Sequence, residues 1–113
     1  MVLKRTKWSP NPNEMSEAKL SRTVVVINSQ GLHARPADLI VKAANRFRSN
    51  VEIVKGQERV DAKSMLSIFT LAALPGTTLV VEAAGPDAAE AIEALCELFE
   101  RGFDELKDKS EDT

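Results

Sequence analysis

The order of strand-like and helix-like segments constrains the fold of this chain more than any other feature. Four segments rich in β-branched and apolar residues predict strands: RTVVVIN (22–28), NVEIVK (50–55), ERVDA (58–62) and TTLVVEAA (77–84). The second and third segments are separated only by Gly56 and Gln57, and this pair predicts a tight turn between two strands.

Three further segments repeat apolar residues every three or four positions and predict helices at about 34–47, 65–74 and 87–106. Ser64 is expected to cap the middle helix, and Asp87 follows a Gly-Pro pair that is typical of a helix start. Cys96 borders the apolar stripe of the last helix and is interpreted as a small buried residue. The order β-α-β-β-α-β-α indicates one α+β domain in which helices cover one face of a sheet.

The chain length suits one core, because 113 residues is the size of a single small domain. We expect this domain at 21–107, between a disordered N-terminal extension at 1–20 and a charged C-terminal tail at 108–113. Trp8 in the extension is expected to dock on the domain or on a partner. The neighbouring Lys4, Arg5 and Lys7 are interpreted as solvated charge.

Charge and cysteine content limit the class of partner and the compartment. The formal net charge of −2, with both signs interspersed, argues against nucleic acid as the main partner. No apolar run reaches the roughly 18 residues that a membrane span needs, so no membrane partner is expected. A single cysteine and the absence of a secretory signal favour the cytoplasm.

The only histidine, His33, lies in GLHARPA (31–37), one residue before the first predicted helix. Amides at a helix start lack helical partners and, together with the helix dipole, attract anions such as phosphate. Arg35 adds a permanently charged fork in the same turn, and Gly31 permits a close backbone approach. Two interpretations follow from the residues: His33 carries a phosphoryl group on an exposed ring nitrogen, or it merely caps the helix.

Other site chemistries find no support in the sequence. One histidine and one cysteine cannot build a clustered metal site, and the acidic residues are too scattered for a hard-cation loop. There is no P-loop, no dinucleotide fingerprint and no GxSxG elbow. Neither a metal nor a cofactor is therefore expected.

Over residues 21–106 the chain closely resembles HPr, the histidine-containing phosphocarrier family of the bacterial phosphoenolpyruvate-dependent sugar phosphotransferase system. The resemblance rests on GLHARPA and on DAKSMLSIFTLAALPGTTLVVEAAGPDAAEAIEAL (61–95). It implies an open-faced sandwich, a four-stranded antiparallel sheet covered on one face by three helices. It also implies that His33 accepts a phosphoryl group on Nδ1, that Arg35 engages this group, and that the amides of Ala34 and Arg35 bind its oxygens.

The resemblance implies partners as well. Enzyme I would supply the phosphoryl group and the IIA domains of sugar permeases would receive it. The chain would then be a covalent intermediate rather than a turnover enzyme, and we expect it to act as a monomer.

Ser64 matches a second motif of the family, at which an HPr kinase/phosphorylase modifies a serine in many bacteria. A phosphate at this helix start is electrostatically favourable and would place a dianion on the face that meets enzyme I. The simpler interpretation is a plain cap, and both can hold together. Ser67 stands where kinase-regulated relatives commonly have glycine.

The helix after Ser64 carries more apolar residues than one face can bury. Met65, Leu66 and Phe69 are expected to face outward as a partner-docking patch beside the histidine, whereas Ile68 and Leu71 are expected to face the core.

Three alternatives to a sugar-uptake carrier remain at this point. The chain could be a regulatory, nitrogen-branch-like phosphorelay, which the sequence does not separate from the sugar branch. It could be a phosphoserine-dependent interaction module, although that class typically lacks the active histidine. A histidine phosphatase would need a second histidine, which this chain does not have.

Overall fold

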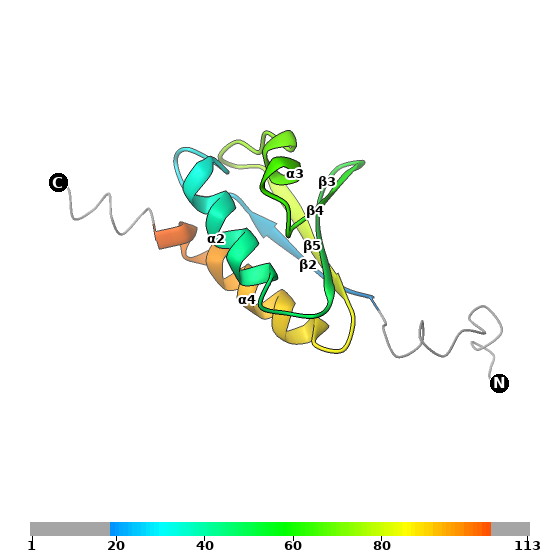
Figure 1. Cartoon of the computed structure of the whole chain (residues 1–113). Helices are drawn as coiled ribbons and strands as arrows, with labels where there is room; N and C mark the ends of the chain where they lie inside the picture. Colours follow the sequence, from blue (N-terminus) through cyan, green and yellow to red (C-terminus); the bar gives the residue numbers. More distant parts are fainter. Residues whose placement is uncertain (1–18, 105–113) are drawn as a thin grey trace.

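The computed structural model describes residues 19–104, which form a four-stranded antiparallel sheet with three helices packed on one face (Figure 1). The strands are β2 (Lys19–Val25), β3 (Asn50–Lys55), β4 (Glu58–Asp61) and β5 (Thr78–Ala84). The helices are α2 (Ala34–Ala44), α3 (Met65–Thr70) and α4 (Ala88–Glu100), and a 3-10 turn, η2 (Gly102–Asp104), follows them. This architecture confirms the predicted α+β fold.

The strands lie side by side in the order β2-β5-β3-β4, and each neighbouring pair is antiparallel. In β5, Leu79, Val81 and Ala83 are buried beneath the helices, while the positions between them lie on the open face. This period of two is what a sheet requires when only one of its faces is covered.

The turn between β3 and β4 has the predicted form. Lys55 pairs with Glu58, so Gly56 and Gln57 alone make the connection. Gly56 has a φ of 60°, a left-handed angle that glycine adopts without steric cost and that two-residue hairpins favour.

The core lies between the sheet and the pair α2 and α4, which pack against each other. Ile40 of α2 and Leu95 of α4 are fully buried there. Cys96 is buried as predicted, and removal from water raises the pKa of its thiol. Phe99 and Phe103 close the core with an edge-to-face contact, their ring centroids 4.9 Å apart.

Both long helices end earlier than the sequence predicted. α2 stops at Ala44 because Arg46 and Phe47 donate to carbonyls only three residues back, which tightens the last turn. α4 stops at Glu100 instead of continuing to 106, because Gly102 and Phe103 both turn left-handed, with φ of 61° and 57°. Phe103 nevertheless reaches the core from this turn, as its apolar character predicted.

The middle helix is also shorter than predicted, ending at Thr70 rather than at residue 74. Ala72 adopts a φ of 50°, which breaks the helix and lets Leu71 and Ala73 both be buried. The early end of the helix has a tertiary cause, because the Ala73 carbonyl accepts a hydrogen bond from the amide of Leu32, 3.1 Å away.

The domain boundaries differ from the prediction at the N-terminal side. Lys19 and Leu20, expected to belong to the extension, pair with Ala84 and Ala83 as the first residues of β2. The remainder of the predicted extension (1–18), and residues 105–113 with the predicted tail, lie outside the described residues. Within residues 19–104, no helix is long and apolar enough to cross a membrane.

Candidate functional site

His33 is the N-cap residue of α2, as the sequence predicted for a residue at the helix start. Its backbone is extended, with φ of −86° and ψ of −160°, and its carbonyl accepts the first helical hydrogen bond from the Ala37 amide at 3.1 Å. Its half-buried side chain makes no capping hydrogen bond to the first-turn amides of α2. His33 thus holds the cap position through its backbone, and its side chain is not the group that caps the helix.

The helix start beside His33 is electrically positive. Ala34 and Arg35 occupy the first two helical positions, where amides point out beyond the end of a helix, and Pro36 contributes no amide. Both Ala34 and Arg35 are exposed, whereas Pro36 is buried against the core. The first turn contains no acidic residue that would offset the helix dipole, and the guanidinium of Arg35 adds to it. Such a start can bind the oxygens of an anion that reaches the imidazole.

The loop before His33 is held rigidly against the loop that follows α3. Gly31 has a φ of 69°, and a Cβ atom at this position would lie 2.4 Å from the Ala73 carbonyl oxygen, so only glycine fits. The amide of Leu32 donates to that same oxygen at 3.1 Å. The buried Asn28 side chain donates to the Gly31 carbonyl at 2.7 Å. These contacts fix the backbone that presents the imidazole.

Lys55 makes a long-range contact near this loop that sequence reasoning missed. Its ammonium group donates to the Leu71 carbonyl at 2.8 Å, where α3 gives way to the loop that contacts Gly31. The side chain spans from the end of β3 to this loop, 16 residues along the chain. No local pattern marks such a contact. The sequence shows only a lysine at the end of an alternating strand.

Ser64 caps α3 as predicted, since its hydroxyl oxygen accepts a hydrogen bond from the Ser67 amide at 3.2 Å. The side chain is half-buried. α3 packs against α2, so this cap and the histidine belong to neighbouring helices.

The predicted outward residues of α3 are exposed to different degrees. Leu66 is 78% exposed and Phe69 42%, whereas Met65 is half-buried and packs against the core. Ile68 and Leu71 are fully buried, as predicted. Leu74, which the sequence had placed inside the helix, is 68% exposed in the loop beside Gly31. Leu66, Phe69 and Leu74 are called the apolar patch below.

The described residues contain no group of three or more histidine, cysteine or acidic side chains that could hold a metal ion. The candidate site combines the His33 imidazole, the Arg35 guanidinium and the start of α2, and this donor set suits an anionic group.

Comparison with known proteins agrees with this geometry. Residues 20–101 match the family model PTS-HPr, described as the PTS HPr component phosphorylation site. Phosphocarrier protein HPr of Treponema pallidum is 44% identical over 84 residues, which cover 74% of this chain and 96% of that protein. Phosphocarrier protein NPr of Shewanella violacea is 37% identical over 87 residues, covering 77% and 96%.

A solved structure shares the fold. HPr-C-His from Thermoanaerobacter tengcongensis superposes with a TM-score of 0.72 at 39% identity, covering 74% of this chain and 94% of that one. Family match, identity and fold agree over the same described domain, and the chain belongs to the PTS-HPr family, the HPr phosphocarrier proteins of the phosphotransferase system.

Proposed function

We propose that His33 accepts a phosphoryl group from phospho-enzyme I and passes it to the IIA domain of a sugar permease. The observation that carries this proposal is the position of His33 at the N-cap of α2, next to the exposed residues Ala34 and Arg35. The imidazole therefore lies beside the positive start of α2 and close in sequence to the guanidinium of Arg35.

The transfer chemistry needs no group beyond this site and its partners. The Nδ1 lone pair attacks phosphorus, the P–N bond forms, and the donor leaves with the electrons of the bond that breaks. The amides of Ala34 and Arg35 and the guanidinium of Arg35 bind the phosphoryl oxygens, because charge-assisted hydrogen bonds to such oxygens are strong. The acceptor then attacks the same phosphorus and restores the imidazole. The protein is a covalent intermediate, not a turnover enzyme.

The apolar patch, together with Met65, is the surface on which enzyme I and the IIA domain dock. Leu66, Phe69 and Leu74 expose apolar area on α3 and on the loop that contacts the histidine loop. Exposed apolar groups that are clustered beside a site are typical of a partner surface. We place the protein in the cytoplasm as a monomer, with each partner docking in turn.

Regulation through Ser64 follows from its place at the start of α3. An HPr kinase/phosphorylase would convert its hydroxyl to a dianion next to Leu66 of the apolar patch, and the desolvation of that charge would weaken docking of enzyme I. We expect Ser64→Asp to slow phosphorylation by enzyme I while Ser64→Ala leaves the rate nearly unchanged. Equal rates in the two variants would count against this mechanism.

A second candidate is a nitrogen-branch-like phosphorelay, which the similarity to the NPr protein favours. The two functions use the same histidine and differ in the acceptor. Transfer from the phosphorylated chain to a sugar-type IIA domain and to a nitrogen-type IIA domain, measured side by side, distinguishes them.

The deciding experiment is intact mass after incubation with phosphoenolpyruvate and enzyme I. We expect one added phosphoryl group that is lost in acid, because P–N bonds are acid-labile. His33→Ala should remain unmodified, and circular dichroism should show that it is folded. A phosphoryl group retained by this variant, or none gained by the unchanged protein, would overturn the proposal.

A further inference from the structure

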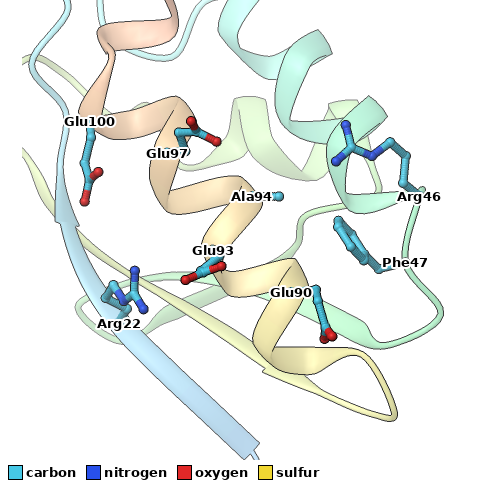
Figure 2. Close-up of a pocket in the computed structure, with 8 residues that line it drawn as sticks. All are labelled: Arg22, Arg46, Phe47, Glu90, Glu93, Ala94, Glu97 and Glu100. Carbon is cyan, nitrogen blue, oxygen red and sulfur yellow. The ribbon is translucent and has the colours of Figure 1, made fainter.

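The solvent-facing side of α4 is strongly acidic. Glu90, Glu93, Glu97 and Glu100 follow one another at spacings of three and four, which places them on one face of the helix, and all four are exposed (Figure 2). They line a surface groove of about 500 Å³, together with Arg22, Arg46, Phe47 and Ala94. Four carboxylates against two guanidinium groups leave this groove with negative charge.

This arrangement is unfavourable for the helix by itself. Like charges three and four residues apart repel, and carboxylates in the last turn face the negative end of the helix dipole. Glu97 pairs with Arg101 at 3.5 Å, but Glu90, Glu93 and Glu100 make no ion pair within residues 19–104. The phosphocarrier site does not use this face, which lies on a different helix from His33. A cationic occupant would remove the repulsion.

A second hollow, of mixed polar and apolar lining, adjoins the acidic face. Leu20, on β2, is 42% exposed although it lies on the helix-covered side of the sheet. It lines a hollow together with Ser21 and Arg22 of β2 and Ala89, Ile92 and Glu93 of α4. The hollow and the acidic groove share Arg22, Glu90 and Glu93, so they form one continuous surface. An occupant with both cations and a large apolar side chain fits it.

The chain itself contains such a segment. Residues 4–8 read KRTKW and combine three cations with the only tryptophan of the protein. They precede the family match, which begins at residue 20. The described chain begins at Lys19, the residue next to Leu20 of the hollow.

Chain length permits the contact. From Trp8 to Lys19 the backbone can extend over about 36 Å. α4, with 13 residues, is about 20 Å long. SPNPN (9–13) between them consists of residues that favour turns, which a return along the helix needs.

We propose that residues 4–8 of this chain dock on the acidic face of α4. The indole of Trp8 lies in the hollow beside Leu20 and Ile92, and the cations of Lys4, Arg5 and Lys7 lie along Glu93, Glu97 and Glu100. The occupant supplies the missing positive charge and covers the half-exposed Leu20.

Fluorescence of the full-length protein tests the proposal, because Trp8 is the only tryptophan. At low salt we expect its emission to be blue-shifted, and its quenching by acrylamide to be weaker, relative to N-acetyltryptophanamide. Both differences should disappear in about 1 M NaCl, where the screening length is only about 3 Å. Glu93→Lys with Glu97→Lys should release the indole, while Glu58→Lys, an exposed site on the other edge of the sheet, should not.

Charge reversal on the segment provides the complementary arm. Lys4→Glu, Arg5→Glu and Lys7→Glu together should release Trp8, and combination with the two α4 reversals should restore the shift. Emission equal to that of the reference compound at low salt, or a shift that survives reversal of α4, overturns the proposal. A shift that grows with protein concentration assigns the contact to a second copy instead and overturns the intramolecular form.

Discussion

The two long helices of this domain begin in opposite ways. The N-cap of α2, His33, makes no side-chain capping bond, and the first turn of that helix contains no acidic residue. The N-cap of α4, Asp87, does not cap its own helix either, but its carboxylate accepts hydrogen bonds from the Arg48 amide and from the Ser49 amide and hydroxyl, at 3.0, 2.9 and 2.6 Å. The first turn of α2 therefore carries no carboxylate, whereas α4 begins at a carboxylate that is hydrogen-bonded to the segment before β3.

Each helix start is preceded by a glycine that lies against another loop. A Cβ on Gly31 would lie 2.4 Å from the Ala73 carbonyl oxygen, and a Cβ on Gly85 would lie 2.6 Å from the Ser49 Cα. The start of α2 and the start of α4 are therefore both held closely against a neighbouring segment. The two helix starts differ in charge: α4 begins at the carboxylate of Asp87, and the first turn of α2 has no acidic side chain.

Exchanging the two N-cap residues for alanine should give the largest and most opposed effects. His33→Ala should abolish phosphoryl acceptance and change the free energy of unfolding by no more than about 0.5 kcal/mol, because the side chain is only half-buried. Asp87→Ala should keep acceptance and lower the midpoint of urea unfolding. Mass spectrometry and urea titration of both variants measure this, and a stability loss in His33→Ala alone would contradict the comparison.

The two glycines should separate rigidity from function. Gly31→Ala and Gly85→Ala should each destabilise the fold by about 1–3 kcal/mol, since both combine a positive φ with a backbone clash. Only Gly31→Ala should also slow transfer from phospho-enzyme I, because it displaces the loop before His33. Gly56→Ala is the control for strain alone, since nothing lies within 4 Å of its added Cβ. Equal transfer rates in all three would show that the loop geometry does not matter.

Acid should weaken the hydrogen bonds that the Asp87 carboxylate accepts. Hydrogen bonds from the Ser49 hydroxyl, and next from the Arg48 amide, lower the pKa of Asp87 from 3.8 to about 2. A lowered folded-state pKa adds stability that is complete above the unfolded pKa and is lost as the pH falls through the folded one. Stability should therefore decrease between about pH 4 and pH 2, with a smaller decrease in Asp87→Asn. An identical pH profile in that variant would show that another carboxylate is responsible.

Substitution of two lysines should give the smallest effects. The two are a matched pair, because each donates one hydrogen bond to a backbone carbonyl. Lys55 donates to the Leu71 carbonyl at 2.8 Å, near the histidine loop, and Lys63 donates to the Phe47 carbonyl at 3.0 Å, beyond the far end of α2. Each change to methionine should cost about 1 kcal/mol in the free energy of unfolding, the usual net value of one hydrogen bond. Lys55→Met should in addition slow phosphoryl transfer modestly. If phosphoryl transfer were slower in Lys63→Met and unchanged in Lys55→Met, the contact near the loop before His33 would not be the one that matters for transfer.

Features that depend on neighbouring residues could be predicted from the local sequence. The strands β3 and β4 and the turn at Gly56 and Gln57 were predicted correctly, because their signals lie within a few adjacent residues. Ser64 was identifiable as a cap, and His33 as a residue at a helix start, because caps are read from a few adjacent positions. The order of strands and helices followed from the same local patterns.

Features that join distant segments could be recognised only in the folded protein. The early end of α3 and the exposure of Leu74 accompany the contact between the loop before His33 and the loop after α3, and Lys55 of β3 separately reaches the Leu71 carbonyl. The depressed pKa of Asp87 depends on Ser49, 38 residues away. Such contacts produce no periodic pattern in the sequence. They form only when folding of the sheet brings distant loops against the ends of the helices.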